Sequence, residues 1–353
     1  MHTSANTVAP SNPAHLGGRT SFVYDGDAEM VRLATFMPRF PSPIDFRRVE
    51  TDESTHWELA LDLPATARIE YRLEITTGDR AAVILDPRNP EIATNPFGEN
   101  SVATGPEYVH PWWRHRTAPA GRVREIRVRS RALGSRRHHH VYTPHGFTAD
   151  APLPLVVAHD GSDYFDHARL GECLDVLIAG DVIPATRVLL LDPVHRHREY
   201  VAAEAHATHL VDEVLPHVRR RFDTTGLPMV MGASLGAVAS WHAFWTHRDA
   251  FAGMFLQSGT FAFDESPFLD ERMGTSIRAF LDDAAEEPRL DGRRVMLTCG
   301  RYESLIDWNG RVAEAMRSDG DVHYHERWAG HDWGAWADEF EAGFLHLLGS
   351  TPV

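Results

Sequence analysis

Hydrophobic and polar positions follow two different periods along the chain. Between residues 69 and 75 every second residue is apolar and the intervening residues are charged. Successive side chains of a β-strand point to opposite faces, so this period of two predicts a half-buried strand. Further short segments of this kind are separated by turn-forming sequences. Together they predict a β-sandwich over residues 19–108, after a flexible N-terminus over residues 1–18.

The remainder of the chain alternates between short apolar runs and segments with helical spacing. The apolar runs fall at residues 154–158, 188–191, 229–231, 253–256 and 295–298. Strand–helix alternation of this extent predicts an α/β fold with a mostly parallel sheet and helices on both faces. We assign this domain to residues 123–353 and interpret the proline-containing segment 109–122 as a linker. Binding sites in such sheets lie at the carboxyl ends of the strands.

One strand–helix junction carries the clearest chemical signal. The apolar run 229–231 leads into Gly232-Ala-Ser-Leu-Gly236, and an apolar helical segment follows. Gly-x-Ser-x-Gly between a strand and a helix is the context of a nucleophile elbow, in which a sharp turn exposes the serine hydroxyl. Ser234 is therefore the predicted nucleophile, and the backbone N–H of Leu235 is placed to bind an oxyanion. The alternative is a small-residue turn with an idle serine.

A serine nucleophile needs a base, and the base needs an acid that orients it. His331 lies in the loop after the last predicted strand and before the last helix, where the base of an α/β-hydrolase belongs. The preceding strand ends at Gly300 and is followed closely by Glu303, which we take as the acid. Asp307, about one helical turn further on, is the alternative that the sequence leaves open.

The second oxyanion donor should come from the loop after an early strand. The strand that ends at Ala158 continues as His-Asp-Gly161, and the N–H of Ser162 or Asp163 would supply this donor. Gly161 would permit the close approach of the backbone that such a loop requires.

Charge and composition indicate which binding partners the protein is not expected to have. The net charge of −15 argues against nucleic acid and anionic membranes. The sequence lacks an apolar run of about 18 residues and the pattern of a signal peptide, so we expect a cytoplasmic protein. Residues 138–140 are three consecutive histidines, but neighbouring strand residues point to opposite faces and cannot all bind one ion. We therefore expect no metal there, and a homo-oligomer is compatible with the sequence.

Five short sequences in the second part of the chain are similar to motifs of a known family. They are His159-Asp-Gly-Ser-Asp-Tyr-Phe165, Arg196-His-Arg-Glu-Tyr200, Gly232-Ala-Ser-Leu-Gly236, Gln257-Ser-Gly259 and Gly330-His-Asp-Trp333. Residues from about 123 to 348 thereby resemble the putative esterase family of α/β-hydrolases, which includes enterochelin, feruloyl and acetylxylan esterases, esterase D and mycolyltransferases. Members often have two glycines before the histidine, and Ala329 replaces the first here. The N-terminal part is similar to the immunoglobulin-like or starch-binding-like modules that precede many such esterases.

The resemblance implies a role for individual residues. It implies Ser234 as nucleophile, His331 as base and Glu303 as acid, with oxyanion donors at the N–H groups of Ser162 and Leu235. The residues expected near the substrate are Asp160, Tyr164, Arg196, Glu199 and Trp333. No metal ion or organic cofactor is implied.

These expectations describe a serine carboxylic-ester hydrolase that acts on a small-molecule ester through an acyl-enzyme. The N-terminal module makes the chain most similar to intracellular enterochelin-type siderophore esterases, and the Arg-rich segment 114–137 favours an anionic substrate. The alternatives are an acyl-sugar esterase of the feruloyl or acetyl type and an acyltransferase of the mycolyltransferase type. A non-catalytic binding protein with a hydrolase fold is a further alternative, against which the intact set of catalytic residues argues.

Overall fold

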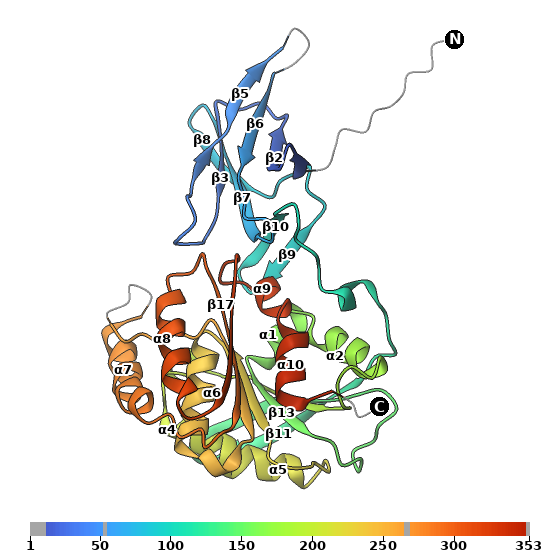
Figure 1. The fold of residues 1–353 in the computed structure, drawn as a ribbon, viewed down its shortest axis with the longest axis vertical. Helices are drawn as coiled ribbons and strands as arrows, with labels where there is room; N and C mark the ends of the chain where they lie inside the picture. The colour runs from blue at the N-terminus through green and yellow to red at the C-terminus, as the bar shows by residue number, and fades with distance from the viewer. Residues whose placement is uncertain (1–11, 52–54, 265–268, 351–353) are drawn as a thin grey trace. The chain divides into compact units, whose positions relative to one another are not determined.

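The computed structural model describes residues 12–51, 55–264 and 269–350. The chain forms two compact units (Figure 1). The first comprises the chain up to Val109 together with the short segments Arg301–Glu303 and Trp328–Asp332, and the second comprises the rest. The segment predicted as a linker, 109–122, thus falls almost entirely within the second unit.

The first unit contains two antiparallel sheets that share a core. One has the strand order β1-β2-β6-β5, and the other β4-β3-β7-β10-β9 with β8 paired to β7. The strands are β1 (Ala14–Leu16), β2 (Arg19–Tyr24), β3 (Met30–Ala34), β4 (Ile44–Asp45), β5 (Arg47–Glu50), β6 (Thr55–Leu61), β7 (Arg68–Thr77), β8 (Arg80–Ile84), β9 (Ile92–Asn95) and β10 (Gly98–Thr104). Phe22 of β2 meets Tyr71 of β7 edge-on, with ring centroids 5.2 Å apart. Both rings lie in one hydrophobic cluster, so the sheets form a β-sandwich.

The sandwich begins earlier in the chain than the sequence pattern indicates. Residues 1–11 lie outside the described residues, but β1 pairs antiparallel with β2. The Asn12 side chain donates hydrogen bonds to the carbonyl oxygen of Val23 (2.6 Å) and to a carboxylate oxygen of Asp86 (3.0 Å). The flexible segment predicted over residues 1–18 is therefore too long. A strand as short as β1 shows too little alternation to be recognised from sequence.

The second unit is an α/β sheet, as the strand–helix alternation predicts. Within the described residues its strand order is β11-β12-β14-β13-β15-β16-β17-β18. The strands are β11 (Arg122–Ser130), β12 (Ser135–Thr143), β13 (Leu155–His159), β14 (Arg187–Leu191), β15 (Met229–Ala233), β16 (Gly253–Gln257), β17 (Arg294–Gly300) and β18 (Asp321–Arg327). From β14 to β18 neighbouring strands are parallel, whereas β12 is antiparallel to β11 and β14. The loops after β13 to β18 consequently share one edge of the sheet.

Helices cover both faces of this sheet (Figure 1). They are η1 (Trp112–His115), α1 (Gly161–Asp166), α2 (Leu170–Ala179), α3 (Arg196–Glu199), α4 (Glu204–Thr208), η2 (His209–Val214), α5 (Leu215–Arg219), α6 (Leu235–Thr246), η3 (Arg248–Ala250), α7 (Glu271–Glu286), α8 (Ile306–Arg317), α9 (Trp333–Ala337) and α10 (Phe340–Leu348). Val157 and Val230 contribute to the core on the α6 side, while their neighbours Val156 and Met231 contribute to the core with α2 and α10. Strands buried on both faces explain the continuous apolar runs. None of the helices in the described part of the chain is long and apolar enough to span a bilayer.

Candidate active site

The turn between β15 and α6 holds Ser234 in a strained backbone conformation. Its φ of 57° and ψ of −123° are rarely adopted by a residue with a side chain. A Cβ atom at Gly232 would lie 2.4 Å from the carbonyl carbon of Gly236, so only glycine permits the turn to close. The strand–turn–helix geometry expected of a nucleophile elbow is therefore present, and Leu235 begins the helix that follows.

Neighbouring strand ends fix the position of Ser234. Its N–H donates to the carbonyl oxygen of Gln257 (2.9 Å), and its own carbonyl oxygen accepts from the N–H of Thr260 (3.2 Å). The hydroxyl groups of Ser234 and Thr260 lie 3.1 Å apart. Asn309 secures the same loop, since its side chain donates to the carbonyl oxygen of Gly259 and accepts from the N–H of that residue, both at 2.9 Å. Sequence reasoning missed Thr260 and Asn309 because neither lies in a recognisable motif.

His331 and Glu303 form a hydrogen-bonded pair in the first unit. The Nδ1 atom of His331 lies 2.6 Å from Oε2 of Glu303. The Glu303 side chain is 1 % exposed and that of His331 is 35 % exposed, so a buried carboxylate orients an accessible imidazole. A carboxylate that accepts from Nδ1 fixes the ring and its tautomer. Asp307, the alternative acid, is exposed in the first turn of α8, and the geometry favours Glu303.

The two expected oxyanion donors differ in what they contact. Leu235 is the first residue of α6, where helix geometry leaves N–H groups without intrahelical partners. The N–H of Ser162, by contrast, donates to Oδ1 of Asp192 (2.9 Å), and its hydroxyl donates to Oδ2 (2.6 Å). An N–H engaged by a carboxylate cannot bind an oxyanion at the same time. The close approach expected at Gly161 is present, since a Cβ there would lie 2.3 Å from Cα of Leu190.

Asp160 and Arg196 form an ion pair beside the elbow. The guanidinium donates from Nε and Nη2 to Oδ2 of Asp160 (2.9 and 2.8 Å) and from Nη2 to the carbonyl oxygen of Ala233 (3.4 Å). The N–H of Asp160 donates to the Tyr200 hydroxyl (3.1 Å). Burial raises the pKa of Asp160 above its usual range, and Arg196 opposes this shift. The pair thus connects the loop after β13 to the last residue of β15.

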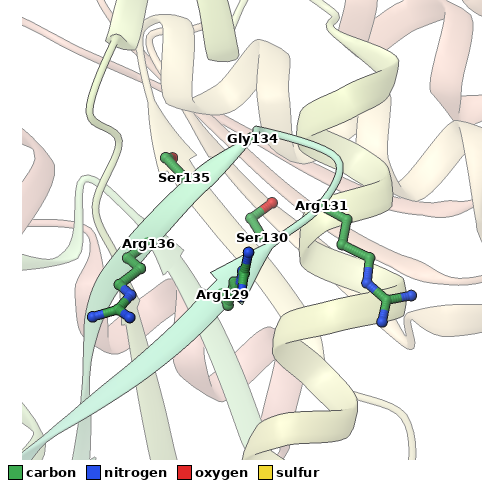
Figure 2. A pocket seen from close by; sticks show the side chains of 6 residues that line it. All are labelled: Arg129, Ser130, Arg131, Gly134, Ser135 and Arg136. Carbon is green, nitrogen blue, oxygen red and sulfur yellow. The ribbon is translucent and has the colours of Figure 1, made fainter.

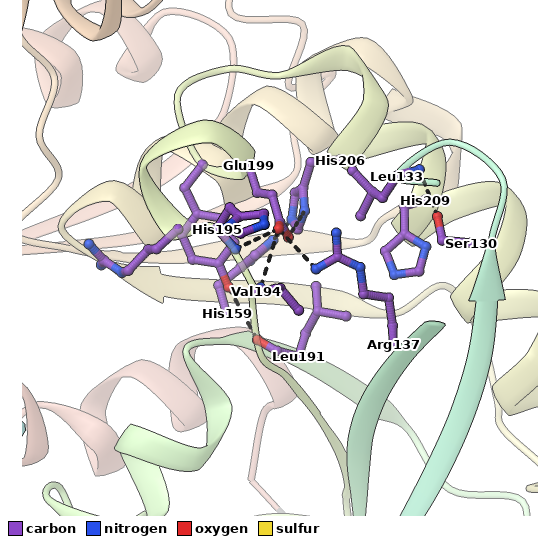
Figure 3. A network of polar contacts seen from close by, with 12 residues as sticks. Ser130, Leu133, Arg137, His159, Leu191, Val194, His195, Glu199, His206 and His209 are labelled. Carbon is purple, nitrogen blue, oxygen red and sulfur yellow. Dashed lines mark hydrogen bonds and ion pairs between the residues drawn. The ribbon is translucent and has the colours of Figure 1, made fainter. Parts of the chain in front are cut away.

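Glu199 is buried and holds the segment before α3 (Figure 3). Its Oε1 atom accepts from Nη1 of Arg137 (2.9 Å) and from the N–H groups of Val194 (3.2 Å) and His195 (2.8 Å). Both side chains of the Arg137–Glu199 pair are nearly inaccessible, at 4 % and 6 % exposure. Glu199 therefore anchors the short helix from which Arg196 reaches Asp160.

The second unit contains two pairs of buried histidines, and Figure 3 shows three of these residues, His159, His206 and His209, together with Glu199. The Nε2 atoms of His159 and His206 lie 2.9 Å apart, and those of His139 and His209 lie 3.2 Å apart. Burial lowers the pKa of His139 and of His159 to about 3, so both rings are neutral at neutral pH. Of the run 138–140 only His139 is buried, which agrees with the prediction that these residues point to different faces.

Tyr164 and Trp333, two further residues expected near the substrate, lie in the interior of the second unit. The Tyr164 hydroxyl donates to Oε1 of Gln257 (2.8 Å), and its ring is edge-on to Trp333 with centroids 5.1 Å apart. Trp333 also contacts Trp336 at 4.7 Å. Tyr164 thus contacts the side chain of Gln257, the last residue of β16. The backbone carbonyl oxygen of the same Gln257 accepts the N–H of Ser234, so these aromatic residues support the elbow through Gln257.

A separate pocket lies at the β11–β12 hairpin, among arginine side chains (Figure 2). Its lining residues are Arg129, Ser130, Arg131, Gly134, Ser135 and Arg136. Strand β12 runs antiparallel to β14, with His140 opposite Leu190 and Tyr142 opposite Val188. The start of β12 therefore lies beyond the end of β14. The hairpin turn that precedes β12 is consequently on the side of the sheet where the parallel strands end.

The described residues contain one group of side chains that could hold a metal ion, formed by Asp321, His323 and His346. Two of these residues are exposed, and Nε2 of His346 lies 3.2 Å from the carbonyl oxygen of Asp321. Asp321 begins β18, so the group lies at the opposite edge of the sheet from the elbow. It has no part in the candidate active site.

Comparison with known proteins bears on the family and the fold of the chain. The family model described as Putative esterase matches residues 130–347. No curated protein matches the sequence significantly. An enterobactin esterase from Shigella flexneri, crystallised in the presence of enterobactin, superposes with a TM-score of 0.76 at 20 % identity, over 93 % of this chain and 92 % of its own. A ferric enterobactin esterase from Salmonella typhimurium gives 0.78 at 19 % identity, over the same shares.

A ferulic acid esterase superposes on a smaller part of the chain. Its TM-score is 0.53 at 18 % identity, over 64 % of this chain and 97 % of its own. The extent of the similarities establishes an α/β-hydrolase fold preceded by a β domain. Because the family model matches more than half of the chain, the protein belongs to the putative esterase family and is a carboxylic ester hydrolase.

Proposed function

We propose that the protein hydrolyses esters through a triad of Ser234, His331 and Glu303. The observation that carries the proposal is the strained Ser234 backbone, which is maintained at a cost of about 1–3 kcal/mol and is typical of a nucleophile elbow. The hydrogen-bonded pair of His331 and Glu303 supports it, because that pair supplies the base and its orienting acid.

Each residue of the triad has one task in the proposed reaction. His331 takes the hydroxyl proton of Ser234 as the oxygen attacks the ester carbonyl carbon, and Glu303 stabilises the imidazolium that forms. The N–H groups of Leu235 and of Asp163, the alternative to Ser162 in the first turn of α1, bind the tetrahedral oxyanion. His331 then protonates the departing alcohol. Water repeats the attack on the acyl-enzyme with the same base, which releases the acid and restores the Ser234 hydroxyl.

Hydrolysis of short p-nitrophenyl esters tests this mechanism. We expect Ser234→Ala to lower kcat by about 10⁴–10⁶-fold, because loss of the nucleophile removes the covalent route. Ser276→Ala is the matched control, since this half-buried serine on α7 bonds only to a carbonyl oxygen of its own helix in the described contacts. Equal turnover by the wild type and Ser234→Ala would contradict the proposal.

We further propose that the substrate is an anionic ester of the siderophore type. The three arginines of the hairpin pocket support this, because they concentrate positive charge at the sheet edge that carries the elbow, within an acidic protein. The similarity to esterases of enterobactin along nearly the whole chain is consistent with such a substrate.

Charge reversal in the hairpin tests the substrate class. The Arg129→Glu/Arg136→Glu variant should raise KM for a catecholate siderophore ester at least about tenfold and leave KM for neutral p-nitrophenyl acetate unchanged. Arg272→Glu on α7 is the control. An unchanged KM for the anionic ester would count against this substrate class, and faster turnover of feruloyl or acetyl sugars in the same panel would favour an acyl-sugar esterase. Ester products formed with an added sugar acceptor would identify an acyltransferase.

A further inference from the structure

The loop that carries His331 is held by a buried arginine of the β-sandwich. Arg68, the first residue of β7, donates its backbone N–H to the carbonyl oxygen of Trp328 (2.9 Å). Its guanidinium Nη1 donates to Oδ1 of Asp332 (2.5 Å), and the two side chains are 4 % and 12 % exposed. Arg68 thus contacts the first and the last residue of the segment 328–332, on either side of His331.

The arginine is itself fixed by further polar contacts. Its Nη2 atom donates to Oε1 of Glu70 (3.1 Å), and the Asn100 side chain donates to Oε2 of Glu70 (2.9 Å). A planar guanidinium with two carboxylate partners has a defined orientation. A buried ion pair of this kind can specify one geometry even where it adds little net stability. The direction of Asp332 is consequently set by β7 and β10.

The loop that carries Glu303 is bound to the same sandwich. The backbone of Tyr302 donates to the carbonyl oxygen of Ala329 (3.1 Å) and accepts from the N–H of Arg39 (3.0 Å). The ring of Tyr302 is edge-on to Phe40 with centroids 5.1 Å apart, and it belongs to the hydrophobic core of the sandwich. The two loops are thereby joined to each other and to the β-strands.

We propose that Arg68 is a positioning residue for His331 and that it acts through Asp332. The inference rests on the proposed function, since the position of His331 matters to catalysis only if it is the base. The backbone beside it has little room, because a Cβ at Gly330 would lie 2.6 Å from Cγ of Met37. A displacement of about 1 Å in such a group can lower the rate on the order of 100-fold. One task of the β-sandwich is therefore to hold the His331–Glu303 pair in its working geometry.

Steady-state kinetics of full-length variants test this role. Arg68→Ala should lower kcat about 10–100-fold with KM within about twofold of the wild type, because the base is misplaced while the substrate site is intact. Arg68→Lys keeps the charge but not the planar fork, and should recover part of kcat. The double variant Arg68→Ala/Asp332→Asn should be no slower than Arg68→Ala, because the two substitutions remove the same contact between Arg68 and Asp332. Arg19→Ala, which removes an exposed ion pair with Asp62, is the control.

Hydrogen–deuterium exchange reports the positioning without any substrate. Peptides that cover residues 328–332 should exchange faster in Arg68→Ala than in the wild type, while those of β13 should not change. Wild-type kcat in a folded Arg68→Ala variant, or unchanged exchange of this loop, would overturn the inference. Absence of ester hydrolysis in the wild type would instead refute the proposed function, and the exchange result would still decide whether Arg68 holds the loop.

A second variant covers the case in which Arg68→Ala does not fold. Asp332→Asn keeps the shape of the side chain and removes its charge, so Arg68 retains a partner in Glu70. This variant should show the same selective fall in kcat and the same faster exchange of residues 328–332, to a smaller degree. If neither changes in Asp332→Asn, the inference is wrong.

Discussion

The nucleophile and the base of the proposed triad are held in place by different kinds of contact. The turn at Ser234 can close because Gly232 and Gly236 lie two residues away on either side, and hydrogen bonds to Gln257 and Thr260, no more than 26 positions away, complete its support. The loop of His331 is held by Arg68, whose partner Asp332 is 264 positions away in the sequence. The elbow therefore depends on residues that are near in the sequence, whereas the loop of the base depends on a residue that is far away in the sequence. Changes that disturb one kind of contact should leave the other intact.

After the loss of Ser234 itself, the largest expected effect on kcat concerns the acid. Glu303→Gln keeps the shape of the side chain but loses the charge that stabilises the imidazolium, so kcat should fall by about 10²–10⁴-fold. Asp307→Asn should stay within about twofold of the wild type. Turnover of p-nitrophenyl acetate measures both. If Asp307→Asn lowered kcat more than Glu303→Gln, Asp307 would be the acid and Glu303 would have no catalytic role.

The elbow itself can be broken by one methyl group. Gly232→Ala would place a Cβ 2.4 Å from the Gly236 backbone, so the turn must open, and we expect unfolding free energy to fall by about 1–3 kcal/mol with severe loss of activity. Gly236→Ala should be milder, since its Cβ would lie 3.3 Å from the nearest atoms, in His159 and Asp160. Urea denaturation and kcat test the ranking. Exchange of residues 328–332 should not change in either variant.

The ion pair beside the elbow should act mainly on stability. Arg196→Ala leaves Asp160 buried without its main cation, and unfolding free energy should fall by about 2–3 kcal/mol, less than for a fully buried pair because a third of Arg196 is exposed. Arg198→Ala, on the exposed side of α3, is the control. Chemical denaturation gives the result. A raised KM with unchanged stability would show instead that Arg196 contacts the substrate.

The smallest effect should appear in the pH dependence of stability. Burial, with Asp332 as the second cause, raises the pKa of Glu70 to about 7 from 4.5. Between these values the folded state binds more protons than the unfolded state, so stability falls as pH rises from about 4.5 to 7, by roughly 1–3 kcal/mol. Glu70→Gln should remove this fall. Thermal unfolding at pH 5 and pH 8 measures the difference, and an equal pH dependence in both proteins would show that Glu70 is charged throughout.

Much of the candidate site could be predicted because its signals are local. The apolar runs from β13 to β17 mark strands buried on both faces, and the two glycines around Ser234 mark a turn that few other residues permit. The places of His331 and Glu303 after successive strands predict them as base and acid. The short strand β1 and the support residue Thr260 were missed, since neither has a periodicity or a motif of its own.

Contacts between residues that are far apart in the sequence could not be predicted from the sequence. The sequence could suggest Ser162 as an oxyanion donor, but not that Asp192 binds its N–H. By itself the sequence determined the order of strands and helices and the chemistry at the ends of the strands, because hydrophobic periods and turn residues encode these locally. Only the tertiary structure decided that Glu303 bonds to His331 and that Arg68 of the β-sandwich holds the His331 loop. Such pairings depend on which segments the folded core brings together, and no local pattern records them.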